Sequence, residues 1–207
     1  KFTMQTIEGL KRRIQSTEDL HSVVKTMKAL AAVSIRQYER ALESLRDYTR
    51  TVELGLQVVL RDRPRFALSA RASFGLRQGA VVFGTDQGMC GSLNEQVLAK
   101  VLSTLAESGA DPKTRAVLAV GERMAALLED AGEQVEAVFS VPGSVAGITP
   151  SVQEVLLHIE SWNREQRVDR VYLFYSRQEA GSVYSPQGMR LLPIDREWLA
   201  GLKGRPW

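Results

Sequence analysis

The first sixty or so residues carry a hydrophobic pattern with the period of a coiled-coil helix. The segment contains no proline, and no glycine lies between Gly9 and Gly55, so nothing in it interrupts a helix. Positions spaced alternately four and three residues apart, from Leu10 to Val59, are apolar except at Thr17, His21, Lys28 and Thr49. This heptad seam predicts one long helix over about residues 4–61 that packs against another helix.

The expected length of this helix exceeds what the rest of the chain can cover. At 1.5 Å per residue it extends roughly 85 Å, whereas the remaining residues form a domain roughly 30–35 Å across. We therefore expect at least half of the helix to project beyond the domain, and its apolar seam to require a partner.

Beyond Pro64 the pattern changes to short apolar runs that alternate with segments of helical spacing. The runs with the character of strands cover residues 79–84, 115–120, 134–139, 170–176 and, as an extended or hairpin segment, 183–193. The segments with helical spacing cover residues 93–107, 122–130 and 150–166, the last with Ser151 as an early cap. Strands that alternate with helices of this length predict right-handed crossovers and a mainly parallel sheet.

The predicted fold class is therefore α/β, with a long coiled-coil helix joined to a small three-layer Rossmann-like domain. We assign the segments as a helix at 1–61, a basic connector at 62–78, an α/β domain at 79–195 and a terminal segment at 196–207. The connector contains Pro64, which ends the helix.

Composition excludes several classes of protein. The single cysteine, Cys90, rules out an internal disulfide and leaves too few thiolates for a cysteine-based zinc site, so no metal or other cofactor is expected. A formal charge of +3 gives little support for nucleic-acid binding, and residues 1–50 carry the whole excess, with ten basic and six acidic side chains. No run approaches the roughly 20 apolar residues that cross a bilayer, so any membrane role is expected to be peripheral.

The turn at residues 84–94 is the candidate site for chemistry. A glycine-rich turn between a strand and a helix can hold an anion at the helix N-terminus. The Walker lysine is missing, however, the glycine spacing is not that of a dinucleotide site, and Asp86 would repel phosphate. We favour a structural or subunit-contact role, in which Gly88 and Gly91 permit tight turns, Cys90 packs, and Ser92 or Asn94 caps the next helix.

The two histidines do not complete a nucleophilic site around Cys90. His21 lies on the long helix and His158 inside an amphipathic helix, where each has the character of an ordinary surface residue. A cysteine nucleophile needs a histidine and an orienting group beside it. The sequence therefore offers no catalytic site.

Two stretches resemble a known family. Residues 7–38, with Leu10-Lys11-Arg12-Arg13-Ile14 and then Val24-Lys25-Thr26-Met27-Lys28-Ala29-Leu30-Ala31-Ala32, resemble the N-terminal helix of ATP synthase gamma subunits. Residues 85–94, Thr-Asp-Gln-Gly-Met-Cys-Gly-Ser-Leu-Asn, are similar to the turn after the first strand of that family's α/β domain. The order and separation of the two stretches agree with the family across nearly all of the chain.

The resemblance implies a central-stalk rotor without a catalytic site of its own. Such a rotor couples transmembrane ion flow to ATP synthesis or hydrolysis in a ring of alpha and beta subunits, and its other implied partners are the epsilon subunit and the membrane c-ring. The implied location is peripheral, on the cytoplasmic face of a bacterial inner membrane or the equivalent face of an organelle membrane. A second long helix is expected after Pro193-Ile194, whereas this chain stops at Trp207.

The resemblance also implies two sets of contact residues. The shaft set comprises Lys11, Arg12, Arg13, Lys25, Met27, Lys28 and Arg36. The foot-turn set comprises Asp86, Gly88, Cys90, Gly91 and Asn94. Neither set contains a catalytic residue or a metal ligand.

Two other functions are compatible with the pattern. A coiled-coil scaffold that presents an α/β interaction domain predicts homodimerisation through the long helix. A nucleotide- or phosphate-binding enzyme that uses Asp86 predicts ligand affinity that is lost in Asp86→Ala.

Overall fold

The computed structural model describes residues 7–62, 77–109, 111–165, 167–179 and 183–204 of the chain. It divides into two compact units, Lys1–Thr51 and Val52–Trp207. Most of the predicted connector, at residues 63–76, lies outside the described residues.

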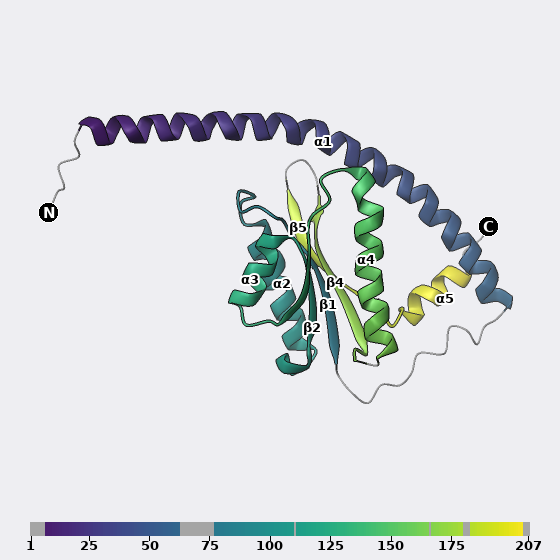
Figure 1. Ribbon diagram of the computed structural model, residues 1–207. Coiled ribbons are helices and arrows are strands. Elements are labelled where there is room, and N and C mark those ends of the chain that lie inside the picture. The colour runs from purple at the N-terminus through teal and green to yellow at the C-terminus, as the bar shows by residue number, and fades with distance from the viewer. Residues whose placement is uncertain (1–6, 63–76, 110, 166, 180–182, 205–207) are drawn as a thin grey trace. The chain divides into compact units, whose positions relative to one another are not determined.

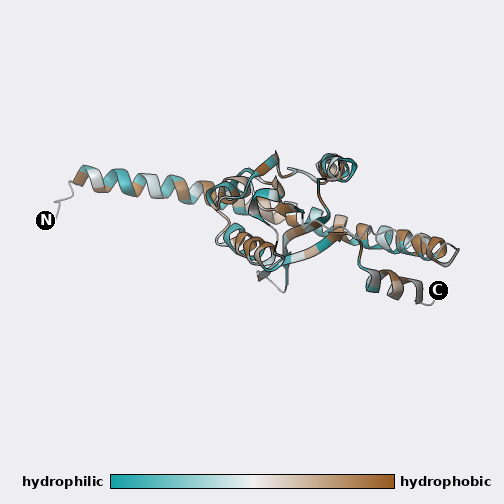
Figure 2. Ribbon diagram, turned by 90° about the horizontal axis from the view of Figure 1, so that it is seen from below, coloured by the Kyte–Doolittle hydropathy of each residue, from teal (hydrophilic) through white to brown (hydrophobic). Residues whose placement is uncertain are grey.

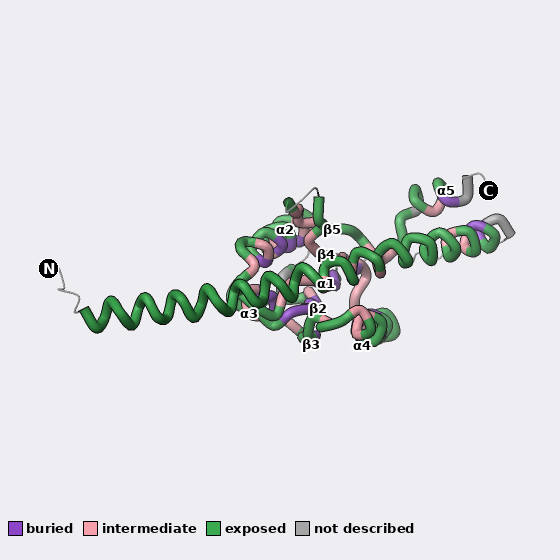
Figure 3. The backbone as a smooth tube through the Cα atoms, turned by 90° about the horizontal axis from the view of Figure 1, so that it is seen from above, coloured by how far each residue is buried: buried purple, intermediate pink, exposed green. Residues whose placement is uncertain are grey.

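The N-terminal element is one uninterrupted helix, α1 (Ile7–Asp62), of 56 residues. At 1.5 Å per residue it is about 84 Å long, so the long N-terminal helix is confirmed. Its residues are exposed over most of its length, and buried ones occur near its C-terminal end (Figure 3). Leu10, Ile14 and Leu42 of the seam are each about half exposed. Hydrophilic and hydrophobic residues are mixed along the helix (Figure 2). The pairing of its seam with another helix stays a prediction.

The α/β domain is built on a five-stranded sheet with the order β3-β2-β1-β4-β5. Its strands are β1 (Gln78–Phe83), β2 (Ala116–Val120), β3 (Val135–Phe139), β4 (Arg170–Gln178) and β5 (Tyr184–Leu192). The first four strands are parallel, with Val81 of β1 in register with Leu118 and Leu173, and β5 is antiparallel to β4. The prediction of a mainly parallel sheet is confirmed.

Helices cover both faces of the sheet, which gives the three predicted layers (Figure 1). On one face, Ala80 and Val82 pack in a core with α2 (Leu93–Glu107) and α3 (Glu122–Asp130). On the other face, Val81 packs in a second core with α4 (Val145–Arg164). Because successive residues of a strand point to opposite faces, a continuous apolar run such as that of β1 supplies both cores.

One feature of the helices differs from the prediction. Helix α4 begins at Val145, with Ser144 before it, so the predicted start at Pro150 and the Ser151 cap are wrong. Pro150 lies inside α4, where a proline cannot donate to the carbonyl of Ala146 and its ring crowds that carbonyl, but the helix continues through it. The last described helix, α5 (Arg196–Gly204), follows Pro193-Ile194, where the resemblance implies the start of a second long helix.

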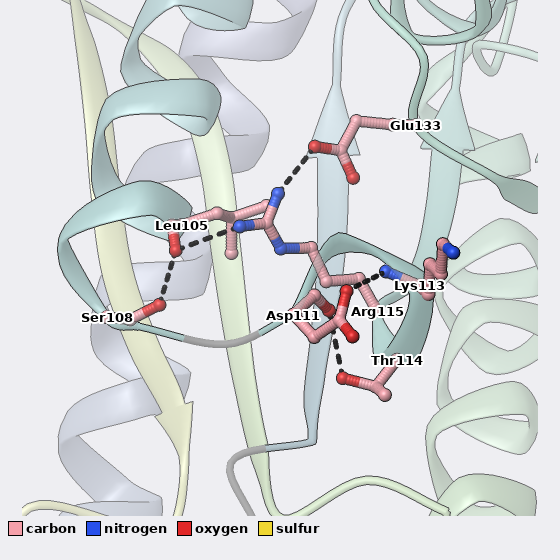
Figure 4. Close-up of polar contacts among 7 residues, drawn as sticks. All are labelled: Leu105, Ser108, Asp111, Lys113, Thr114, Arg115 and Glu133. Atoms are coloured by element: carbon pink, nitrogen blue, oxygen red, sulfur yellow. Dashed lines mark hydrogen bonds and ion pairs between the residues drawn. The ribbon is translucent and has the colours of Figure 1, made fainter.

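A buried ion pair joins elements at the amino ends of β2 and β3 (Figure 4). Arg115 Nη1 lies 2.7 Å from Glu133 Oε1, and the two side chains are only 8% and 5% exposed. Arg115 Nη2 also donates to the main-chain carbonyl of Leu105 at 3.2 Å, near the end of α2. The pair fixes α2, β2 and β3 to one another, and removal of either partner would leave a buried charge uncompensated.

Candidate functional site

The turn after β1 is held together by its own side chains. The Asn94 side chain, in a residue only 1% exposed, accepts a hydrogen bond from the Thr85 N–H at 3.1 Å and donates to Thr85 Oγ1 at 2.8 Å. Its Nδ2 also lies 3.3 Å from Cys90 Sγ. The amide of Asn94 therefore fixes both ends of the turn, and the turn has a defined shape without a ligand.

The carboxylate of Asp86 connects this turn to two others. Its Oδ1 accepts a hydrogen bond from the Glu122 N–H at the start of α3 at 3.1 Å. Its Oδ2 accepts one from the Val141 N–H, just beyond β3, at 3.1 Å. The first amide of α3 is thus already satisfied by an anionic side chain of the same chain, which argues against phosphate binding there.

Glycines allow the backbone to pack closely at this edge of the sheet. Gly91 has a φ of +63°, a conformation that favours glycine, as the tight-turn prediction requires. Gly121 has a φ of +115°, and a Cβ there would lie 2.6 Å from the carbonyl oxygen of Thr85. Gly88 is not among the glycines with positive φ, and its position has room for a side chain, so the tight-turn prediction does not hold for Gly88.

The predicted cap of α2 is absent. Ser92 occupies the N-cap position, but its side chain makes no capping hydrogen bond and instead accepts one from Gln96 Nε2 at 2.9 Å. Asn94 lies inside the helix, and its amide serves the turn. The first turn of α2 therefore lacks a side-chain cap from either residue.

The foot-turn set divides into exposed and enclosed residues. Asp86, Gly88 and Gly91 are exposed, Cys90 is partly buried, and Asn94 is buried. Asn94 can therefore shape the surface of the turn but contributes almost nothing to that surface.

The most exposed apolar side chain of the turn, that of Met89, belongs to neither contact set predicted from the sequence. Met89 is 65% exposed, and Val141, which Asp86 holds through its main chain, is 39% exposed. The sequence feature that could have indicated Met89 is an apolar residue in a turn, between Gly88 and Gly91. Exposed apolar side chains on a fixed backbone are a common feature of interaction surfaces.

All seven residues of the shaft set lie on α1, and all are exposed. Four of them, Lys25, Met27, Lys28 and Arg36, lie between Asp19 and Glu39, a stretch that contains no acidic residue. This part of α1 therefore carries positive charge together with the apolar side chains of the seam.

The described residues contain no arrangement typical of catalysis. Among them, no group of three or more His, Cys, Asp or Glu side chains could hold a metal ion. His158 lies against Phe139, with the ring centroids 5.2 Å apart, and Cys90 contacts Thr85, Gln87 and Asn94 without a histidine partner. No helix within the described ranges is long and apolar enough to pass through a membrane.

Comparison with known proteins gives the family. The family model described as ATP synthase matches residues 6–204, which is nearly the whole chain. The chain belongs to the ATP synthase family. It is similar to the ATP synthase gamma chain of Polynucleobacter necessarius subsp. necessarius (strain STIR1), with 21% identity over 197 residues that cover 95% of this chain and 68% of the relative.

A solved structure of an ATP synthase has a similar fold. The match is to the central stalk and c-ring of the Tetrahymena thermophila mitochondrial ATP synthase, with a TM-score of 0.63, 21% identity and coverage of 83% of this chain and 72% of the other. The resemblance to gamma subunits is therefore confirmed, and the chain is a non-catalytic subunit of a rotary ATP synthase. The solved structure supports its fold.

Proposed function

We propose that this subunit couples transmembrane ion flow to ATP synthesis or hydrolysis by turning inside a ring of alpha and beta subunits. The observation that carries the proposal is the exposed apolar seam of α1. A helix of 56 residues with Leu10, Ile14, Leu42 and Leu45 about half exposed has its stabilising partner outside the described residues.

The composition of α1 suits a shaft that slides past its neighbours. Residues 29–32 are Ala-Leu-Ala-Ala, so another helix or a surrounding collar can approach the backbone closely. Met27, which is 36% exposed, is unbranched and accommodates changing contacts. We assign Met27, Lys28 and Arg36 to the contact with the alpha and beta subunits, because a rotor needs contacts weak enough to break at each step.

We propose the turn after β1 as the surface that contacts other subunits at the foot of the central stalk. Its exposed residues include the run from Asp86 to Met89, on a backbone fixed by Asn94 and Asp86. We assign this surface to contacts with the epsilon subunit and the c-ring. The subunit would then belong to an extrinsic, membrane-associated complex, on the cytoplasmic face in a bacterium or the equivalent face in an organelle.

The test is assembly together with coupling. The chain is co-expressed with the alpha, beta and epsilon subunits and the membrane sector of one ATP synthase, and complex formation, ATP hydrolysis and ATP-driven ion pumping are measured. We expect stoichiometric incorporation, and we expect Met27→Lys or Lys28→Glu to impair coupling or assembly while the α/β domain stays folded.

The matched control is Lys113→Glu, which makes the same charge reversal at an exposed lysine of the α/β domain. It should leave both incorporation and pumping unchanged. A chain that ignores the alpha and beta subunits and instead forms homodimers through α1 would favour the scaffold over the rotor. Unchanged pumping in both shaft variants would count against the assigned contacts.

A further inference from the structure

Main-chain hydrogen bonds connect three neighbouring strands at the carboxyl edge of the sheet. The Gly84 N–H after β1 donates to the Val120 carbonyl of β2 at 2.8 Å, and the Gly121 N–H after β2 donates to the Phe139 carbonyl of β3 at 2.7 Å. The Arg123 N–H of α3 returns to the Thr85 carbonyl at 3.0 Å. These bonds hold the ends of the strands, but they do not reach the exposed parts of the turns that follow β1 and β3.

The side chain of Asp86 makes that further connection. It begins in the turn after β1 and accepts hydrogen bonds from Glu122, where the turn after β2 enters α3, and from Val141 in the turn after β3. Both bonds are charge-assisted, and the bond to Glu122 lies at the positive end of α3. One carboxylate thus ties together the three turns that carry the exposed residues Gln87, Gly88, Met89 and Val141.

We infer that Asp86 is a positioning residue that makes these three turns one rigid surface, so that the surface transmits load instead of deforming under it. The inference rests on the proposed function of the foot turn as a subunit contact. If the three turns moved separately under load, the partner could slip on this surface, and the shaft would then turn without always moving its partner. The carboxylate removes that freedom without itself being the contact.

The chain offers a matched control for this inference. Asp111 is also exposed and also accepts a local main-chain hydrogen bond, from the Lys113 N–H at 3.0 Å, but it lies before β2 at the amino edge of the sheet. Asp86→Ala removes the connection between the turns. Asp86→Asn keeps one acceptor oxygen, places an amide group where the second oxygen lies, and should therefore behave as an intermediate. Asp111→Ala removes an equivalent carboxylate at the other edge.

The first measurement tests the connection itself in the full chain. Amide hydrogen exchange is followed by NMR at Glu122 and Val141. We expect exchange at both amides to accelerate about tenfold or more in Asp86→Ala, as for loss of a hydrogen bond to a charged group, while amides inside β1 and β2 are unaffected. Asp111→Ala should leave Glu122 and Val141 unchanged. Unaltered exchange in Asp86→Ala would overturn the inference whatever the chain does in a complex.

The second measurement tests the consequence in the assembled ATP synthase. The ratio of ions pumped to ATP hydrolysed is compared among complexes that have incorporated each variant to the same extent. We expect the ratio to fall in Asp86→Ala, to fall less in Asp86→Asn and to stay unchanged in Asp111→Ala. A merely stabilising role would lower incorporation but not this ratio.

The outcomes separate the inference from the proposed function. Faster exchange with an unchanged pumping ratio would overturn the role of Asp86 in transmission while leaving the rotor intact. Failure of the unaltered chain to incorporate would overturn the proposed function and, with it, the transmission role, whereas the exchange data would still decide whether Asp86 holds the three turns.

Discussion

Helix α1 and the α/β domain use the same apolar residue types in opposite ways. In the domain, Leu105, Leu118 and Leu128 are completely buried in two cores on either side of the sheet. On α1, Leu42 and Leu45 are 55% and 49% exposed. The domain thus contains the partners of its own hydrophobic residues, whereas we expect the seam of α1 to find its partners outside the described residues. On this account, the domain is stabilised by its own core and α1 is stabilised by assembly.

The largest expected effect concerns polar pairs in the two regions. Glu133→Ala should lower the free energy of unfolding of the domain by about 3–5 kcal/mol, because it leaves the Arg115 guanidinium buried without its counter-charge. On α1, Asp19→Ala removes only an exposed hydrogen bond from Gln15 and should change stability by less than about 0.5 kcal/mol. Urea denaturation followed by circular dichroism measures both. Comparable losses from the two variants would show that burial does not distinguish these regions.

The next prediction compares the same apolar truncation in the two regions. Leu128→Ala should destabilise the domain by about 2–5 kcal/mol, because the side chain is fully buried and leaves a cavity. Leu42→Ala should change the stability of the free chain by less than about 0.5 kcal/mol, because the side chain is 55% exposed. In the assembled complex, however, Leu42→Ala should weaken incorporation of the chain. A large loss of stability in the free chain would mean that the seam is already covered.

Glycine-to-alanine substitutions should have opposite effects on stability in the two regions. Gly121→Ala should destabilise the domain by about 1–3 kcal/mol, because its φ is +115° and the new Cβ would meet the Thr85 backbone. Gly55→Ala in α1 meets no atom within 4 Å and should stabilise the helix by about 0.5–1 kcal/mol. Thermal unfolding followed by far-ultraviolet circular dichroism gives the sign of each change as a shift of the unfolding midpoint by roughly a few degrees. A destabilising Gly55→Ala would indicate a close neighbour on that side of α1.

The sequence pattern predicted the elements that depend on local periodicity. The uninterrupted period from Leu10 to Val59 predicted α1, and the alternation beyond Pro64 predicted the parallel strands and the helices between them. The start of α4 was predicted five residues late, because a proline inside a helix is costly and therefore indicates a boundary, whereas α4 continues through Pro150.

The features that sequence did not predict depend on contacts between distant residues. Arg115 and Glu133 are 18 positions apart, and Asp86 and Val141 are 55 apart, so neither partnership has a local signature. Asn94 was assigned to a helix cap and to a subunit contact, but only the folded turn shows that its amide is enclosed. The location of the foot turn was therefore predictable from the sequence. Which of its residues hold the turn in shape and which are exposed was not.

The measurement that tests the central claim most directly is hydrogen exchange along α1, in the free chain and in the complex with alpha and beta subunits. We predict that amides of residues 7–51 exchange rapidly in the free chain and become strongly protected on assembly, while those of β1 and β2 are protected equally in both states. Equal protection of α1 in the free monomer and in the complex would contradict the claim that the exposed seam is completed by the subunits around it.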